Sequence, residues 1–134
     1  MTLTKNLAKF MGLSVLLVAI GMISNKSAAI QTMNALFTDA PLMWITGVFT
    51  MMLGIAIVII HNRWHGGALP VIVTLYGWIA LLKGLSFVCL PPSTQAQLYR
   101  AMHFEQYFYA WLLVPLVLGG YLVYAGFQPE RTAR

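Results

Sequence analysis

Four long apolar stretches dominate this 134-residue chain and limit what it can fold into more than any other feature. They cover about residues 7–24, 41–60, 69–90 and 106–125, and each can cross the roughly 30 Å hydrocarbon core of a bilayer as a helix. In lipid every backbone amide and carbonyl must be paired within the protein, which a helix achieves. We therefore predict an all-α, polytopic membrane protein, a four-transmembrane-helix bundle in which residues 1–134 form a single membrane domain.

Composition supports this class and excludes others. The chain is 60% apolar and 8% charged, whereas soluble domains carry roughly 25% charged residues. The formal net charge of +5 comes from basic residues scattered at the ends of the apolar stretches, without the clustered basic face that nucleic-acid binding needs. We expect the lipid bilayer as a partner and no nucleic acid.

The basic residues beside the spans predict the orientation, since positive residues gather on the cytoplasmic side of a membrane. An even number of spans puts both termini on one side. Five basic residues then lie on that side and two on the other, which places both termini in the cytoplasm. The five are Lys5, Lys9, Arg63, Arg131 and Arg134, and the two are Lys26 and Arg100.

The first apolar stretch has two interpretations. It ends near the small residues 27–29, a sequence of the kind that signal peptidases accept. It is, however, longer than a usual signal-peptide core, and its interior carries Gly12 and Gly21 as spanning helices often do. We expect a retained helix and keep cleavage as the alternative.

Short helices at the membrane interface are expected between the spans. Apolar side chains recur at helical spacing over residues 30–37 with polar ones between them, which is typical of an amphipathic interfacial helix. Thr94 and Gln97 match a capping box and predict the start of a second interfacial helix that continues through Arg100. The spans would thus be joined by one or two short helices.

Turn-forming residues set the ends of the middle spans. Asp39 before Pro41 predicts a helix start, because aspartate accepts first-turn amides and proline is tolerated there. Residues 61–67 form a short polar connector, so the second and third spans should be antiparallel neighbours. Pro91 and Pro92 end the third span.

Lys83 is the only charged side chain that hydropathy places at membrane depth, about 10 Å from the non-cytoplasmic end of its span. An intramembrane charge persists only when it is paired, snorkelling or functional. Glu105 is the partner we favour, if the third and fourth spans are neighbours. Lys83 could equally snorkel to headgroups, or attract an anion or a quinone carbonyl in a cavity. Tyr76 lies on the same helical face and would extend such a site.

Other polar and small residues in the spans favour packing. Hydroxyls such as that of Thr74, a further ligand candidate beside Lys83, more often bond carbonyls of their own helix. The glycines at 47 and 54, and the small residues at 77, 80 and 84, make two grooves for close helix contact. Such contact could occur within one chain or between two protomers.

Metal, redox and catalytic chemistry have weak support. His61 and His65 have the i, i+4 spacing of two metal ligands, but the segment is a turn without other ligands, so they are better interpreted as interfacial polar residues. Cys89 is the only cysteine, which excludes an internal disulfide, and we interpret it as a small buried side chain.

All histidines lie at span ends, which argues against intramembrane haem. No intramembrane carboxylate supports a proton-coupled exporter, and no nucleophile has a histidine within reach. We expect no cofactor and no enzymatic activity.

Two motifs lie in the middle third of the chain, HNRW at residues 61–64 and TLYGWIALLKG at residues 74–84. An HN-x-W turn followed by a TL-x-GW-x-x-L-x-KG helix resembles a pattern in uncharacterised bacterial small four-helix integral membrane proteins. The resemblance implies four spans in a bacterial inner membrane and brings no activity with it. A looser similarity to the DoxX-like proteins rests on size and helix count alone.

Two functions remain from different classes. The first is a non-enzymatic accessory or interaction subunit that assembles with itself or with a larger membrane complex, as the small-residue grooves suggest. The alternative is a carrier or binding protein for a small anion or lipid-like molecule that uses Lys83. The direction in which Lys83 points separates them, because a cavity would favour binding and a lipid-facing side chain would not.

Overall fold

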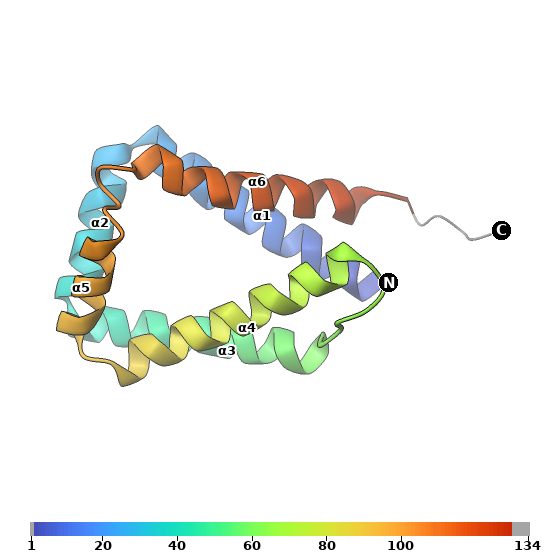
Figure 1. Ribbon diagram of the computed structural model, residues 1–134, viewed down its shortest axis with the longest axis horizontal. Coiled ribbons are helices and arrows are strands. Elements are labelled where there is room, and N and C mark those ends of the chain that lie inside the picture. Colours follow the sequence, from blue (N-terminus) through green and yellow to red (C-terminus); the bar gives the residue numbers. More distant parts are fainter. Residues whose placement is uncertain (1, 130–134) are drawn as a thin grey trace.

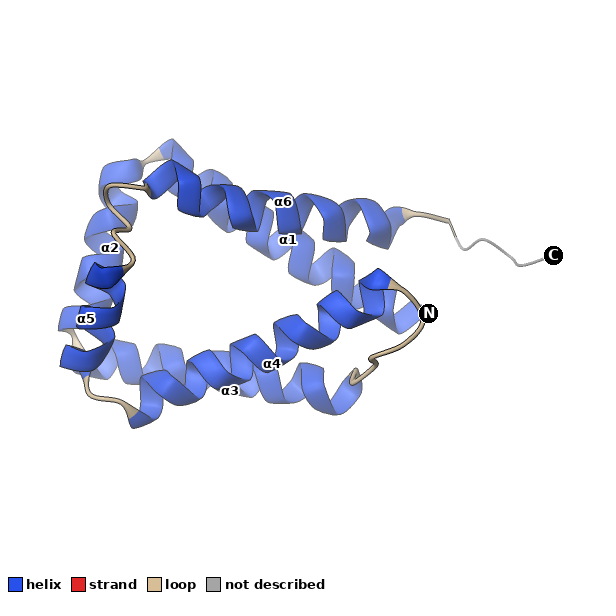
Figure 2. Ribbon diagram, in the orientation of Figure 1, coloured by secondary structure: helices blue, strands red, loops and turns tan. Residues whose placement is uncertain are grey.

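The computed structural model describes residues 2–129, and this part of the chain consists of helices joined by short turns (Figures 1 and 2). Four helices are long and apolar enough to cross a membrane, and two are shorter. The prediction of an all-α protein with four spans and one or two short helices is confirmed, and the number of short helices in the described residues is two. The candidate spans are α1 (Thr2–Ser24), α3 (Ala40–Ile60), α4 (Ala68–Cys89) and α6 (Phe108–Phe127), and the shorter helices are α2 (Lys26–Thr38) and α5 (Pro92–Ala101).

The four spans form two pairs, α1 with α6 and α3 with α4 (Figure 1). The pairs approach each other at the end where α1 begins and diverge toward the other end, where α2 and α5 lie side by side and connect them. Hereafter these are the narrow end and the wide end. The second and third spans are antiparallel neighbours, as predicted. The expected proximity of the third and fourth spans is wrong, because α6 packs chiefly along α1.

Glycines allow α3 and α4 to touch backbone to backbone. A methyl group on Gly54 would overlap the backbone of Leu81, and one on Gly84 would overlap the backbone of Met51. At Gly47 an added methyl carbon would lie 2.7 Å from the Cβ of Phe87. Close approach of this kind adds dispersion contacts that hold helices together in lipid. Both small-residue grooves predicted from the sequence therefore face each other inside the chain.

Glycines also allow close contact between α1 and α6, at positions that the sequence analysis did not identify as a groove. A methyl carbon on Gly12 would lie 2.9 Å from the carbonyl oxygen of Gly119. At the narrow end the Lys5 ammonium donates to the carbonyl of Gln128 over 2.9 Å. The start of α1 and the end of α6 therefore lie together, as an even number of spans requires. Arg131 and Arg134, which entered the orientation prediction, lie outside the described residues.

Helix ends agree with the sequence where side chains cap them. The Asp39 carboxylate accepts the amide of Leu42 over 2.9 Å and caps α3 as predicted. The predicted capping box at Thr94 is wrong, because α5 already begins at Pro92 after a Pro91 cap. A proline suits the first helical turn, since its missing amide would be unpaired there anyway. The fourth span begins at Phe108, because residues 102–107 form turns.

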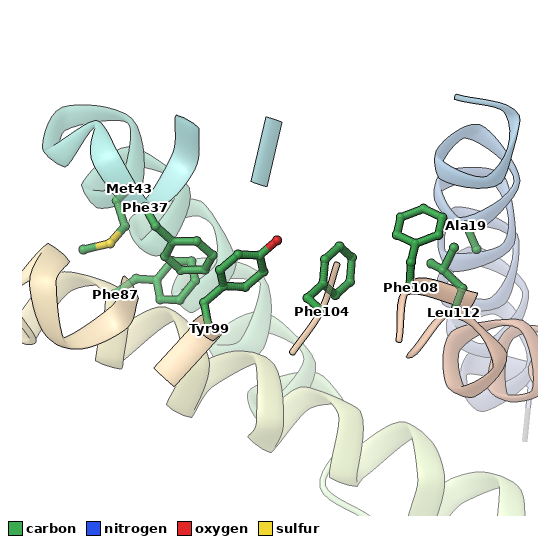
Figure 3. Packing of buried hydrophobic residues seen from close by; sticks show 8 residues of the cluster. All are labelled: Ala19, Phe37, Met43, Phe87, Tyr99, Phe104, Phe108 and Leu112. Carbon is green, nitrogen blue, oxygen red and sulfur yellow. The ribbon is translucent and has the colours of Figure 1, made fainter. Parts of the chain in front are cut away.

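Buried side chains form one cluster at each end of the molecule. The narrow-end cluster contains Ala8, Met11, Ile57, Val73 and Leu122. The wide-end cluster joins residues of all six helices with Phe104 of the connecting turn, and Figure 3 shows its aromatic rings extending from α4 toward α6. Its members are Ala19, Phe37, Met43, Phe87, Tyr99, Phe104, Phe108 and Leu112. Cys89 is exposed at the end of α4, so its interpretation as a buried side chain is wrong.

Candidate ligand cavity between the helix pairs

A cavity of about 490 Å³ lies at the wide end, between the diverging helix pairs. We call it the Lys83 cavity, after the residue that distinguishes it. All six helices contribute side chains to its wall, and most of these are apolar or aromatic. Its volume falls in the range of roughly 300–1,000 Å³ that is usual for small-molecule sites.

Lys83 is the only charged side chain among the described residues that line this cavity. Its ammonium lies 5.7 Å from the centre of the Phe87 ring, one helical turn further along α4. A cation over an aromatic face gains some electrostatic stabilisation, but less than a carboxylate partner provides. Lys83 therefore lies at the wall of an apolar space, and its side chain is exposed.

Glu105, the predicted partner of Lys83, makes a different contact. Its Oε1 accepts a hydrogen bond from the Asn34 side-chain amide over 3.0 Å. Glu105 lies in the turn before α6 and Asn34 lies in α2, so the bond joins two segments at the wide end. Lys83 and Glu105 thus have different partners in this structure, because α4 pairs with α3 and not with α6.

Hydroxyl groups in the cavity wall donate to the backbone of their own helices. Thr46 Oγ1 donates to the Leu42 carbonyl and Thr50 Oγ1 to the Thr46 carbonyl, both over 2.8 Å. Ser86 Oγ donates to the carbonyl of Lys83 over 2.7 Å. A hydroxyl has one proton to donate, so these groups offer only acceptor positions to a ligand. The Lys83 ammonium supplies the positive charge and its own donors.

Tyr76 faces a neighbouring pocket of about 300 Å³ between α1, α4 and α6. Met22, Leu112 and Pro115 line both this pocket and the Lys83 cavity, so the two spaces share a wall. Pro115 lies in the middle of α6, where proline removes a helical hydrogen bond and favours a bend. Tyr76 and Lys83 therefore lie along one interior region of α4, although in separate pockets.

Stacked and edge-on aromatic rings form the wide-end wall of the Lys83 cavity (Figure 3). The Phe37 ring lies 5.9 Å from that of Phe87 and 4.7 Å from that of Tyr99. The Tyr99 ring lies 5.5 Å from Phe104, which lies 5.5 Å from Phe108. This row of rings connects the two helix pairs where they are furthest apart.

Tyr99 is the wall residue that the sequence failed to identify. Its side chain is 7% exposed, and within residues 2–129 its hydroxyl has no hydrogen-bond partner. Burial raises the pKa of the phenol, and the negative charge of Glu105 raises it further. From the sequence, a tyrosine near the end of a span is typical of the aromatic belt at a membrane interface, and no further signal marks this one as buried.

His61 and Thr74, two other candidates, lie at the narrow end and hold the α3–α4 turn in place. His61 is 2% exposed, with Nε2 2.8 Å from Thr4 Oγ1 and Nδ1 3.3 Å from Thr74 Oγ1. Thr74 Oγ1 also accepts the amide of Arg63 over 3.0 Å. Burial lowers the pKa of His61, an effect that the Arg63 charge increases. These contacts give both residues a structural role.

The weak metal hypothesis gains no support from this arrangement. His65 is exposed, whereas His61 is buried against threonines. Over residues 2–129, no three histidine, cysteine or acidic side chains come close enough to hold a metal ion. The other motif residues in this turn also bond locally, since the Trp64 indole donates to Asn62 Oδ1 over 2.8 Å. The HN-x-W motif and the threonine that follows it therefore build a turn.

Comparisons with family models, curated proteins and solved structures give no match for this chain. The resemblance of the 61–64 and 74–84 motifs to small bacterial membrane proteins stays a prediction. What is established is coarser: the chain is a polytopic membrane protein with four candidate spans. Any more specific function must be argued from the Lys83 cavity and its surroundings.

Proposed function

We propose that this protein binds or carries a small amphipathic anion, a lipid-like molecule with one acidic group, in the Lys83 cavity. One observation carries the proposal: a single ammonium lines an otherwise apolar cavity of about 490 Å³ to which all six helices contribute. Among the alternatives for Lys83, its place in the cavity lining supports a ligand, whereas its exposed side chain keeps snorkelling to lipid headgroups as the competing interpretation. We propose a binding role and not a catalytic one.

The Lys83 charge and the apolar wall of the cavity are complementary to a ligand that has both an anionic group and an apolar part. An ammonium in a low-dielectric region is stabilised by an anion far more than by a ring face. The apolar wall would bury a hydrocarbon tail at about 25 cal/mol per Å² of apolar surface removed from water. A molecule with an acidic head and an apolar body satisfies both parts.

The divergence of the helix pairs supports a route for such a molecule. An amphipathic anion dissolves in the bilayer, and the cavity lies between the α1–α6 and α3–α4 pairs where they separate. Entry from the lipid phase would need no passage through water. We propose a bacterial inner membrane with both termini in the cytoplasm as the setting, on the basis of the sequence.

The alternative of an accessory subunit loses part of its motivation. Gly47, Gly54, Gly77 and Gly84 contact side chains or backbone of the same chain, so these grooves are not left open for a second protomer. Assembly with another copy or with a larger complex stays a prediction. Native mass spectrometry from mild detergent tests it, and a strict monomer without bound proteins would count against it.

The ligand proposal is tested by replacing the charge and keeping the shape. Dodecanoate and dodecanol are titrated into the purified full-length protein, and binding is followed by tryptophan fluorescence. The wild type should prefer dodecanoate by about tenfold, which corresponds to roughly 1.4 kcal/mol. Lys83→Met should remove that preference and leave dodecanol binding unchanged.

Lys9→Met is the matched control, because it removes the same charge at the narrow end, where the Lys9 ammonium lies over the Phe127 ring. Thermal unfolding shows whether each variant is folded. A folded Lys83→Met protein that still prefers dodecanoate as the wild type does would reject the proposal. Equal affinity of the wild type for the two probes would reject it as well.

A further inference from the structure

A second pocket, of about 520 Å³, lies at the wide end on the other side of the aromatic row. It is bounded by α2, α5 and the turn before α6, and we call it the α2–α5 pocket. Phe37, Tyr99 and Phe104 line both this pocket and the Lys83 cavity. Its polar lining is much richer than that of the cavity and comprises Asn34, Thr38, Arg100, His103, Glu105 and Gln106.

Opposite charges stand in the same pocket. Arg100 provides a guanidinium from the last turn of α5, and Glu105 provides a carboxylate from the following turn. Asn34 donates to Oε1 of Glu105 over 3.0 Å and so orients the carboxylate, whose other oxygen keeps its acceptor positions. A ligand with only a negative charge would be repelled by the Glu105 carboxylate, and one with only a positive charge would be repelled by the Arg100 guanidinium. A ligand that carries both charges avoids both repulsions.

Tyr99 supplies an independent indication of a ligand. Its side chain is more than nine-tenths buried, and its hydroxyl lacks a partner within the described residues. A buried hydroxyl without a hydrogen bond is costly, and most such groups in native proteins find a partner. Figure 3 shows the oxygen pointing away from the Phe37 and Phe87 rings. Tyr99 and Glu105 both line the α2–α5 pocket, in agreement with the effect of the Glu105 charge, which raises the pKa of the phenol.

We propose that the α2–α5 pocket binds a phosphoethanolamine group, with the primary ammonium on Glu105 and the phosphate on Arg100 and the Tyr99 hydroxyl. Guanidinium groups pair well with phosphate oxygens, and a tyrosine hydroxyl can donate to them. The side chains of Arg100 and Glu105 are exposed and can turn onto the ligand. Contact with the Tyr99 hydroxyl also requires the groups that bury it to move aside. The source can be a membrane lipid headgroup or the free phosphate ester.

Packing of the aromatic rings favours a primary over a quaternary ammonium. A quaternary ammonium is recognised by open aromatic faces arranged as a cage. Here the Phe37 and Tyr99 rings stack on each other at 4.7 Å, so these faces are already covered. A primary ammonium instead needs hydrogen-bond acceptors, which the Glu105 carboxylate offers.

The test compares short-chain lipids that differ only in headgroup. Dihexanoyl phosphatidylethanolamine, phosphatidylcholine and phosphatidylglycerol are added to the purified full-length protein, and thermal unfolding is followed by tryptophan fluorescence. The wild type should be stabilised most by the ethanolamine lipid, with about tenfold tighter binding than for the other two. Glu105→Gln should abolish that difference. Equal stabilisation of the wild type by all three lipids would overturn the proposal.

Tyr99→Phe separates a ligand contact from a structural role. Without lipid the variant should unfold at the wild-type temperature or above it, because it removes a buried hydroxyl that has no partner. With the ethanolamine lipid, the increase in its unfolding temperature should be smaller than that of the wild type. Tyr107→Phe, at an exposed position, is the matched control and should gain as the wild type does. An undiminished gain in folded Tyr99→Phe would overturn the role of the phenol.

Two further measurements identify whether the ligand is a lipid or the free phosphate ester, and distinguish this site from the Lys83 cavity. Arg100→Gln should weaken binding of all three phospholipids, whereas Arg63→Gln, at the narrow end, should not. Stabilisation by soluble phosphoethanolamine equal to that by the lipid would identify the free ester as sufficient. Lys83→Met should lose its preference for dodecanoate and keep its preference for the ethanolamine lipid, so either proposal can fail alone.

Discussion

The Thr4 hydroxyl and the His61 imidazole lie 2.8 Å apart although 57 positions separate them in the sequence. This buried hydrogen bond joins the first turn of α1 to the turn between α3 and α4. Since the two helix pairs make few other contacts, it is a main polar link between them at the narrow end. His61, which the sequence offered as a weak metal ligand or an interfacial turn residue, thus helps to hold the two halves of the fold together.

Acid should weaken this link. Burial lowers the pKa of His61 in the folded protein, whereas the imidazole of the unfolded chain titrates near the usual value of about 6.5. The unfolded chain therefore binds more protons below that pH, and the stability present above it is lost as the pH falls toward the lower folded pKa. We expect a lower thermal unfolding temperature at pH 5.5 than at pH 7.5. His61→Asn should reduce this dependence, and exposed His65→Asn should retain it. An identical pH dependence in His61→Asn would show that another group is responsible.

Gly54→Ala should destabilise the α3–α4 pair. The new methyl group would overlap the backbone of Leu81, and overpacking typically costs about 1–3 kcal/mol. Gly21→Ala is the control, because no atom lies within 4 Å of the added carbon, and alanine favours helix by about 1 kcal/mol. Thermal unfolding in the same detergent measures both. Equal stability of the two variants would contradict the close contact of α3 and α4.

Two adjacent glycines in α6 give an even closer comparison. A methyl carbon on Gly119 would lie 2.9 Å from the Leu16 side chain and 3.2 Å from the Gly12 carbonyl, whereas at Gly120 it would meet nothing within 4 Å. Gly119→Ala should therefore lower the unfolding temperature, and Gly120→Ala should leave it unchanged or raise it. The reverse order would mean that α6 presents a different face to α1.

Asp39→Ala should remove the N-terminal cap of α3. The aspartate accepts the Leu42 amide over 2.9 Å, and loss of such a cap costs about 1 kcal/mol. Asp39→Asn retains a side-chain acceptor and should stay close to the wild type. Chemical unfolding of the three proteins, followed by circular dichroism, measures the differences. An Asp39→Asn protein as unstable as Asp39→Ala would assign the effect to charge and not to the hydrogen bond.

The sequence contained enough information for the spans and several helix ends. Length and hydropathy identify four apolar stretches, and local chemistry identifies the Asp39 cap and the end of α4 before Pro91. Prolines also misled the prediction, since Pro92 starts α5 two residues before the expected capping box at Thr94. These features depend on residues that are close together in the sequence, so they can be inferred from the sequence without knowledge of the tertiary structure.

The pairing of the spans could not be obtained in the same way. Helices in lipid are apolar on every face, so hydropathy does not mark the face that packs. Gly12 and Gly119 form the close contact between α1 and α6. In the sequence they resemble ordinary glycines of spanning helices. Without that pairing, a Glu105 ion pair, snorkelling and a ligand role all stayed open for Lys83. The cavity and the buried Tyr99 hydroxyl depend on the tertiary arrangement alone.

In the sequence, α3 and α4 lie between α1 and α6, the two helices of the other pair, and this order has a consequence for biosynthesis. The principal partner of α1 is α6, the last of the described helices to leave the ribosome. During translation the α3–α4 hairpin can close as soon as Cys89 is inserted, while the Gly12 face of α1 remains in contact with lipid or an insertase. The order of synthesis thus leaves the wall of the Lys83 cavity incomplete until α6 is in the membrane.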